Sequence, residues 1–236
     1  MSELVFVRHG QASFGADSYD KLSVKGVEQV RILAQHWLEI GEQFDYLYHG
    51  TLLRQKETAK ELLPLIHSHS SRVIEHSFLN EYNGDPLLRA YLENHAKADG
   101  FNVFIDWPIK DEKLFQELFE RATSLWVKGE LQPRLNDNEF EAWEDFQFRV
   151  YGVIDEIIAS HSSGSRVLVS TSGGVIAMAL QRVLQFPDEK VISTNWMVHN
   201  SSVTRFKYGN GKVSLTQFNS LPHLERNEFK HMITYR

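Results

Sequence analysis

A short apolar run near the start of the chain, ending in charged and imidazole side chains, constrains the fold more than any other stretch. Residues 4–7 (Leu-Val-Phe-Val) are apolar without interruption, which is typical of a strand buried on both faces of a sheet. The run stops at Arg8-His9-Gly10-Gln11. In an open parallel sheet, the loops at the carboxyl ends of the strands line the ligand crevice. The sequence therefore predicts Arg8 and His9 at such a crevice, beside a glycine that permits a sharp turn.

The composition limits the kind of protein that this chain can be. Its 236 residues can form one α/β domain or two small ones, and 42% hydrophobic with 24% charged residues is ordinary for a globular chain. A net charge of -6 gives no reason to expect a nucleic-acid partner. The lack of cysteine excludes disulfides and thiolate metal sites. Since there is no signal-peptide pattern and no apolar run of membrane length, we expect a cytoplasmic protein with no membrane partner.

Further strands are predicted from apolar segments bounded by turn residues: 44–48, 72–74 and 166–170, followed by a hairpin of 202–208 with 213–218. Helix patterns lie between them, from the cap Ser23 to Gly41, at 52–63 and at 175–184. Strands that alternate with helices over short links indicate parallel pairing with right-handed crossovers. We expect a three-layer α/β/α sandwich with a mostly parallel, doubly wound sheet.

The middle of the chain has a different pattern. Residues 87–128 read as mostly helical, 129–138 as a loop, and 140–158 as a strongly amphipathic helix. Strand signal is weak throughout this stretch. We therefore predict one domain over residues 1–236, interrupted at about 85–148 by a helical insertion that covers the pocket and selects the substrate.

Groups suited to phosphate chemistry stand at the ends of successive predicted strands: Arg8 and His9, Arg54, Glu81, and Ser172-Gly173-Gly174 at a helix start. Arginine guanidinium groups match phosphate oxygens bidentately, and the N–H groups at a helix start attract anions. A neutral imidazole can attack phosphorus, and a carboxylic acid can protonate the leaving oxygen. No cluster of metal ligands accompanies the arginines, so we expect neither a metal nor another cofactor.

Four motifs occur in order along the chain: Arg8-His9-Gly10; residues 19–23 (Tyr-Asp-Lys-Leu-Ser) leading to Gly26 and Gln29; residues 51–54 (Thr-Leu-Leu-Arg) leading to Thr58; and the strand 167–169 before Gly173-Gly174. As an ordered set they resemble the histidine phosphatase superfamily, in its phosphoglycerate mutase-like branch. The resemblance spans nearly the whole chain and is weakest in the helical insertion. It implies a hydrolase of small phosphate monoesters.

The resemblance also implies roles for individual residues. His9 becomes phosphorylated during turnover, Arg8 and Arg54 clamp the phosphoryl group, and Glu81 donates the proton. The remaining predicted substrate-binding residues are Gly10, Gln11, Ser172 and Gly173.

Ser172 departs from the family pattern, because the family carries a second histidine directly before the paired glycines. A serine can donate one hydrogen bond to a phosphoryl oxygen but brings no positive charge. Loss of one preorganised donor typically costs about 10²–10³-fold in rate. His199 and His223 follow this strand in the sequence, and either is a candidate for the missing imidazole.

Other functions remain open at this point. The chain can be a catalytically impaired phospholigand-binding or regulatory protein, and Ser172 favours this alternative. A phosphoglycerate mutase-type transferase ranks lower. In a further alternative, Ser172 is the nucleophile of a hydrolase, with Asp188 and His199 as its partners. In the simplest interpretation, Ser172 has no chemical role and is only the N-cap of the following helix. The sequence leaves the oligomeric state open, with a homodimer among the alternatives.

Overall fold

The structure is a computed structural model that describes residues 1–13, 20–67, 72–101, 109, 111–132 and 140–235. Parts of the predicted helical stretch 87–128 and of the predicted loop 129–138 lie outside these residues, as does Tyr19. The chain divides into two compact units, one formed by Met1–Glu81 with Val150–Arg236 and the other by Tyr82–Arg149. The boundary between Arg149 and Val150 falls inside the helix Trp143–Ser160.

A six-stranded sheet forms the centre of the first unit, in the order β3-β2-β4-β1-β5-β6. Four strands pair in parallel: β1 (Ser2–Arg8), β2 (Tyr46–His49), β3 (Val73–Glu75) and β4 (Arg166–Thr171). The antiparallel pair β5 (Val203–Gly209) and β6 (Lys212–Ser220) extends the sheet beyond β1. The predicted strands and the hairpin are therefore confirmed, and the sheet is mixed but mostly parallel.

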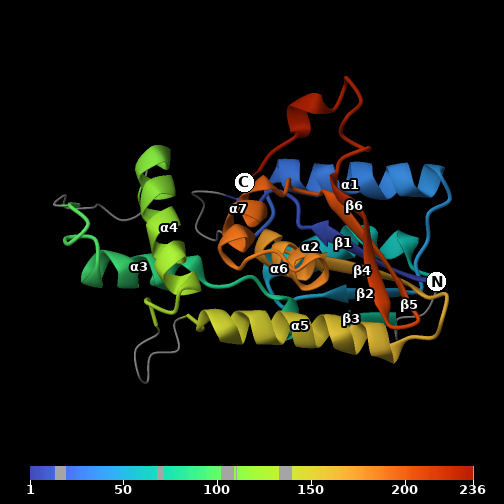
Figure 1. The fold of residues 1–236 in the computed structure, drawn as a ribbon. Helices are drawn as coiled ribbons and strands as arrows, with labels where there is room; N and C mark the ends of the chain where they lie inside the picture. The colour runs from blue at the N-terminus through green and yellow to red at the C-terminus, as the bar shows by residue number, and fades with distance from the viewer. Residues whose placement is uncertain (14–19, 68–71, 102–108, 110, 133–139, 236) are drawn as a thin grey trace. The chain divides into compact units, whose positions relative to one another are not determined.

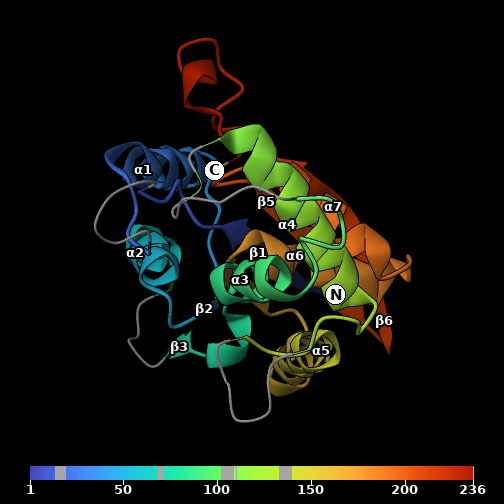
Figure 2. The same cartoon turned by 90° about the vertical axis from the view of Figure 1, so that its left-hand side faces the viewer.

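Helices cover both faces of this sheet, as Figures 1 and 2 show. On one face lie α1 (Val24–Glu39) and α2 (Leu53–Leu62). On the other lie α6 (Gly173–Leu184) and the part of α5 (Trp143–Ser160) that belongs to the first unit. The predicted three-layer α/β/α sandwich is thus confirmed. The helix α7 (Glu189–Met197) follows α6 and was not predicted.

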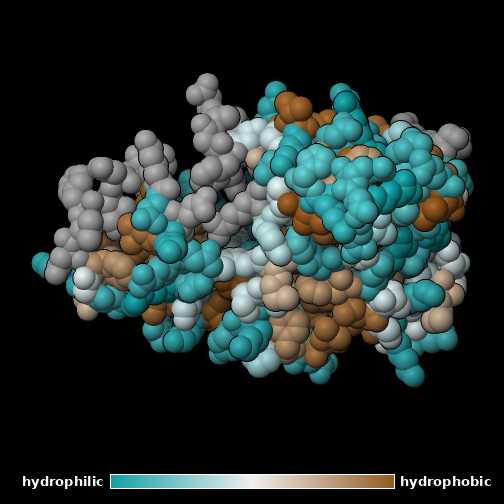
Figure 3. All heavy atoms as spheres, turned by 90° about the horizontal axis from the view of Figure 1, so that it is seen from above, coloured by the Kyte–Doolittle hydropathy of each residue, from teal (hydrophilic) through white to brown (hydrophobic). Residues whose placement is uncertain are grey.

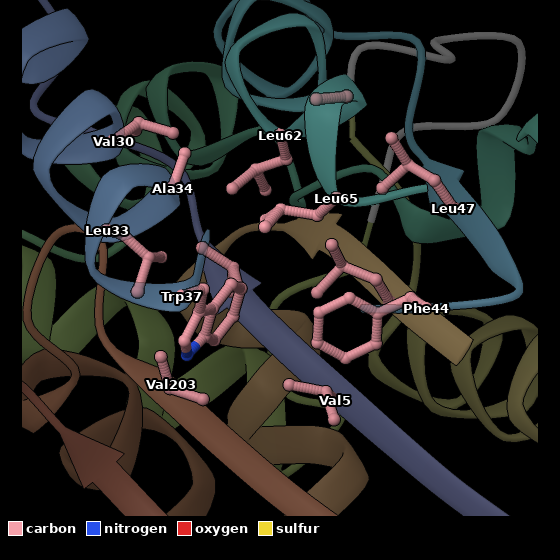
Figure 4. Packing of buried hydrophobic residues seen from close by; sticks show 13 residues of the cluster. Val5, Val30, Leu33, Ala34, Trp37, Phe44, Leu47, Leu62, Leu65 and Val203 are labelled. Carbon is pink, nitrogen blue, oxygen red and sulfur yellow. The ribbon is translucent and has the colours of Figure 1, made fainter. Parts of the chain in front are cut away.

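The apolar core under α1 and α2 follows from the alternation of side chains along the strands. Val5 and Val7 of β1 point to this face, and Leu168 of β4 packs beside them. Trp37 of α1 and Phe44 close the cluster with ring centroids 5.3 Å apart, which Figure 4 shows. This packing anchors the carboxyl end of β1, where Arg8 and His9 follow.

Local sequence signals explain where α1 begins and where the β5–β6 hairpin turns. Ser23 caps α1 as predicted, because its Oγ accepts a hydrogen bond from the Gly26 N–H at 3.0 Å. The β5–β6 hairpin turns at Asn210 and Gly211, both with positive φ. Two successive positive φ values are typical of the tight turns that Asn-Gly favours.

The second unit contains α3 (Gly84–Asn94), α4 (Glu112–Val127) and the first residues of α5. Its core is aromatic: Trp126 packs at centroid distances of 4.9, 5.0 and 5.8 Å against Tyr82, Trp143 and Phe146. Its described residues contain no strand. This unit spans the stretch that we predicted as a helical insertion. That the whole chain works as one domain stays a prediction.

Among the described residues, no helix is both long enough and apolar enough to cross a lipid bilayer. Hydrophilic residues predominate on the face that Figure 3 shows, with smaller hydrophobic areas between them.

Candidate active site

The backbone of His9 is held from two sides directly after β1. Its N–H donates to the Thr171 carbonyl of β4 at 2.8 Å. Its carbonyl accepts from the Asn200 side-chain amide at 3.3 Å and from the Ser201 N–H at 3.4 Å. The ring is therefore presented from a backbone fixed between β4 and the turn before β5.

The hydrogen bonds of the His9 ring define its tautomer. The Gly10 carbonyl lies 2.7 Å from Nδ1, and because a carbonyl only accepts, Nδ1 carries the proton. The other ring nitrogen, Nε2, is then unprotonated and accepts from Arg54 Nε at 3.2 Å. Burial, together with the positive charges of Arg54 and Arg8, holds the pKa of His9 well below its usual 6.5. The ring is thus a neutral imidazole with its lone pair facing a guanidinium group.

Arg54 is positioned by the first turn of α2 and by Asp20. Its Nη1 donates to Asp20 Oδ1 at 2.6 Å, while Asp20 Oδ2 accepts from the Leu53 N–H at 2.8 Å. One carboxylate therefore fixes both the side chain of Arg54 and the start of its helix. Our sequence analysis did not give Asp20 a role.

Arg8, the last residue of β1, donates from Nη1 to the carbonyl of Val198, directly after α7. Its backbone carbonyl accepts from the Ser201 N–H at 3.1 Å. Arg8 is thus tied to the segment between α7 and β5.

Two glycines allow the loop after β1 to cross the start of α1 at close range. A Cβ on Gly10 would lie 2.2 Å from the Gly26 carbonyl oxygen, and one on Gly26 would lie 2.1 Å from that of Gln11. The Gly10 N–H donates to Thr58 Oγ1 at 3.2 Å, and the Gln11 N–H donates to Gln29 Oε1 at 2.9 Å. The crossing requires both glycines, which explains why the sequence motif contains them.

Glu81 lies at the amino-terminal end of α6. Its Oε2 accepts from the Gly174 N–H at 2.8 Å. A helix amino terminus stabilises a nearby negative charge, so Glu81 shares the anion-attracting end of α6 with Ser172 and Gly173. Gly173 admits Asn195 of α7, whose Oδ1 would lie 2.2 Å from a Cβ at this position.

Ser172 is fully buried at the position before α6, but its side chain makes no capping hydrogen bond. Ser172 is therefore the N-cap residue by position, as predicted, but its hydroxyl does not cap the helix. Its Oγ instead accepts from Gln55 Nε2 at 2.9 Å. Since Gln55 directly follows Arg54, the first turn of α2 contacts both His9 and Ser172.

Among the described contacts, neither His199 nor His223 hydrogen-bonds to Ser172, and each ring has another partner. His199 lies 3.2 Å through Nδ1 from Asn219 Oδ1 and packs on Tyr235 with a ring-centroid distance of 4.1 Å. His223 is 1% exposed, its Nε2 lies 2.9 Å from Ser201 Oγ, and burial lowers its pKa to about 3. Asp188, the other suggested partner of a Ser172 nucleophile, accepts from Gln181 at 2.7 Å.

The described residues include no group of three or more His, Cys, Asp or Glu side chains arranged to hold a metal ion. The first turn of α2 links the imidazole of His9, through Arg54, to the buried hydroxyl of Ser172 beside it. The Glu81 carboxylate lies at the same helix start as Ser172, and the positive charge of Arg8 acts on His9. Such a set can bind a phosphoryl group and provides a nitrogen nucleophile for it.

Comparison with known proteins places these features in a family. The sequence profile described as the histidine phosphatase superfamily (branch 1) matches residues 4–126 and 103–221. A curated relative, the mitochondrial serine/threonine-protein phosphatase Pgam5 of Drosophila simulans, is 25% identical over 203 residues, covering 85% of this chain and 56% of the relative. The chain thus spans about half the length of this relative.

Two solved structures share the fold. YhfR of Bacillus stearothermophilus matches with a TM-score of 0.68 at 18% identity, covering 95% of this chain and 100% of that one. A phosphoserine phosphatase mutant of Entamoeba histolytica in complex with phosphoserine matches with a TM-score of 0.64 at 17% identity and the same coverage. The profile match confirms the resemblance seen in the sequence: this chain belongs to branch 1 of the histidine phosphatase superfamily.

Proposed function

We propose that this chain hydrolyses small phosphate monoesters through a phosphohistidine intermediate on His9. The observation that carries the proposal is the tautomer of His9, whose unprotonated Nε2 faces Arg54 Nε at 3.2 Å. A nucleophile must present a lone pair, and the lowered pKa keeps the ring neutral at ordinary pH. A phosphoryl group that displaces this hydrogen bond would meet the His9 nucleophile at phosphorus and the Arg54 cation at its oxygens.

The first step forms a bond from His9 Nε2 to phosphorus as the bond from phosphorus to the ester oxygen breaks. The helix start favours the Glu81 carboxylate, but the negative charge of the bound phosphate ester would favour its protonated form. That carboxyl gives its proton to the leaving oxygen, so an alcohol departs. Arg8 and Arg54 bind the equatorial oxygens of the transferring phosphoryl group, and the Ser172 hydroxyl donates a hydrogen bond to one of these oxygens. Here the protein acts mainly by positioning and charge stabilisation.

The second step returns the enzyme to its starting state. Water attacks the phosphohistidine, the Glu81 carboxylate takes a proton from that water, and the bond between Nε2 and phosphorus breaks. Inorganic phosphate leaves, His9 regains its lone pair, and Glu81 is protonated again. Neither step requires a metal ion.

A turnover assay with an aryl phosphate tests the proposal, with phosphoserine as a second substrate because a similar structure holds it. Acid-labile, base-stable label on His9 after rapid mixing with ³²P-labelled substrate is the expected intermediate. We expect turnover to persist in a chelator. A strict requirement for magnesium or zinc, or labelling at another residue, would overturn the mechanism.

Ser172 supports a second candidate function, that of a phospholigand-binding protein. The sequence resemblance implies that the serine stands where the family pattern has an imidazole, and a serine brings no charge. Phosphate binding without turnover of any monoester would favour this candidate over the enzyme.

A further inference from the structure

The partner of Ser172 is a glutamine that the sequence analysis did not single out. Gln55 is fully buried in the first turn of α2. Its Nε2 donates to Ser172 Oγ and to the Leu79 carbonyl, both at 2.9 Å. Its backbone carbonyl accepts from Ser170 Oγ at 2.9 Å, so Gln55 is held at both ends.

The surroundings of Gln55 leave one orientation for its amide. The Leu79 carbonyl can only accept, so the amide nitrogen must face it, and the same nitrogen reaches Ser172. The amide oxygen faces Gly50, where a Cβ would lie 1.9 Å from it. Among the described residues that oxygen has no hydrogen-bond donor. A flipped amide would set its oxygen against the Leu79 carbonyl oxygen and lose that hydrogen bond, while Ser172 Oγ would have to donate instead of accept. The Leu79 carbonyl therefore selects the orientation in which the amide donates to Ser172.

This polarity decides what Ser172 does. Because Gln55 donates, Ser172 Oγ accepts, and its own proton is free to point elsewhere. Within the described part of the chain, Ser172 Oγ donates to no acceptor. A buried hydroxyl whose lone pair is occupied by an amide is a donor held ready for an incoming acceptor.

We propose that Gln55 is a positioning residue that orients Ser172 to donate to a phosphoryl oxygen, so that the two form a neutral oxyanion subsite. This inference rests on the proposed function, since it assigns a role within the same site. The subsite has a property that an imidazole lacks: neither an amide nor a hydroxyl titrates between about pH 5 and 9, so its donor strength does not vary with pH.

A double-mutant cycle tests whether Gln55 acts through Ser172. Gln55→Met follows the same side-chain path without a donor, and the Leu79 carbonyl keeps its bond from Thr171 Oγ1 at 2.6 Å. We expect Gln55→Met to lower kcat on an aryl phosphate about tenfold with KM nearly unchanged, because the bond matters most in the transition state. In a Ser172→Ala background the same substitution should change kcat less than about twofold.

Two further variants separate positioning from packing. Gln55→Glu keeps the shape but offers only acceptors, so Ser172 would turn its proton toward the carboxylate; we expect a larger loss than for Gln55→Met. Ser170→Ala is the matched control, because it removes a buried bond to the Gln55 backbone and leaves the amide in place. If Gln55→Met lowers kcat equally in the wild-type and Ser172→Ala backgrounds, Gln55 has a packing role and the inference is overturned. The same conclusion follows if Ser170→Ala lowers kcat as much as Gln55→Met does.

Binding of inorganic phosphate, measured by calorimetry, distinguishes failure of this inference from failure of the proposed function. If the wild-type chain binds phosphate but turns over no ester, the hydrolase proposal fails. The inference then still requires Gln55→Met to weaken phosphate binding only when Ser172 is present. Equal phosphate binding by the wild type and by Gln55→Met would overturn the inference. A wild-type chain that neither binds phosphate nor turns over an ester would overturn the inference and the hydrolase proposal together. If Gln55→Met does not fold, Gln55→Glu carries the same test.

Discussion

The two ends of the central sheet hold their arginines in opposite ways. At the amino end, Arg166 of β4 pairs with Glu3 at 2.8 Å and with Glu42, and Arg205 of β5 pairs with Glu42 at 2.8 Å and with Glu3 at 3.4 Å. Each carboxylate therefore meets two guanidinium groups. At the carboxyl end, Arg54 donates to an imidazole as well as to Asp20.

The two clusters lower the pKa of a neighbouring group for different physical reasons. Burial alone would raise the pKa of Glu42, but hydrogen bonds from Arg205 and Arg166 outweigh it and lower the pKa. At the other end, burial and the same kind of cation lower the pKa of His9 by disfavouring its charged form. Arginines thus satisfy charge at one end and keep an imidazole uncharged at the other. Perturbations of this second kind are concentrated at functional sites.

The largest expected effect comes from removing the nucleophile. His9→Ala should reduce turnover at least about 10³-fold, because no other described group presents an unprotonated nitrogen to Arg54. The free energy of unfolding by urea should change by less than about 1 kcal/mol, since the lost side chain is poorly solvated beside two cations. Turnover that survives, or labelling elsewhere, would place the nucleophile outside this end of the sheet.

Exchanging one arginine for lysine at each end sharpens the comparison. Arg54→Lys should lower kcat/KM about 10²–10³-fold, because a lysine cannot contact His9 and Asp20 with the planar fork that arginine provides. The matched variant Arg166→Lys at the amino end should leave kcat/KM within about twofold. Similar losses from both variants would show that the two ends do not differ in function.

Introducing an imidazole beside α6 should raise turnover only if space is made for it. Ser172→His alone would place its ring against Gln55 Nε2, which lies 2.9 Å from Ser172 Oγ. Gln55→Ala removes as many side-chain heavy atoms as Ser172→His adds, so the double variant conserves volume. We expect the double variant to gain about ten- to hundredfold in kcat, and the single Ser172→His variant to gain nothing. A gain from the single variant would show that Gln55 does not occupy this space.

Disrupting the amino end should affect stability and not turnover. Glu42→Gln should lower the free energy of unfolding by about 1–3 kcal/mol at neutral pH, because two partly buried hydrogen bonds lose their charged acceptor. Since the folded pKa of Glu42 is lowered, its contribution is present above its usual 4.5 and lost as the pH falls below that value. The difference between wild type and variant in urea unfolding should therefore shrink in acid. A change in kcat would contradict this division.

The smallest expected effect is on the pH profile. Because the pKa of His9 is lowered, its reactive neutral form should persist as the pH falls from about 8 to 6.5, with less than about twofold change in kcat/KM. Arg54→Gln removes one of the nearby positive charges and should move the acid limb of the profile to higher pH. An unmoved limb would mean that Arg54 does not set the protonation of His9.

Much of the fold could be predicted because it depends on local patterns. The strands β1 and β4 are apolar runs that end at glycine or polar residues, and Ser23 is a cap with a helix pattern behind it. The helix α7 could not be predicted in this way, since only Val191 and Ile192 of it are buried and they give no helical stripe.

The site was predictable only where its residues stand at strand ends or shortly after them. Arg8 ends β1 and His9 follows it, whereas Arg54 and Glu81 come five and six positions after the ends of β2 and β3. The structure places Arg54 against His9 and Glu81 at the start of α6. The roles of Asp20 and Gln55 could not be predicted in this way, because they depend on hydrogen bonds across 34 and 117 positions. For the same reason, the sequence suggested histidines as substitutes near Ser172, whereas the side chain that reaches it is an amide.

The hydrogen bonds that hold His9 also set the order in which the site can assemble during synthesis. His9 is made 191 positions before Asn200, yet its carbonyl accepts from the Asn200 side chain, whose own oxygen accepts from Thr234 at 2.9 Å. Gln29, which receives the Gln11 N–H, donates to Met232 and Thr234 as well. While the ribosome is still adding residues before 232, the loop after β1 lacks these partners. A nascent chain can therefore pair β1 with β4 and bury much of its core before the loop after β1 gains these hydrogen bonds.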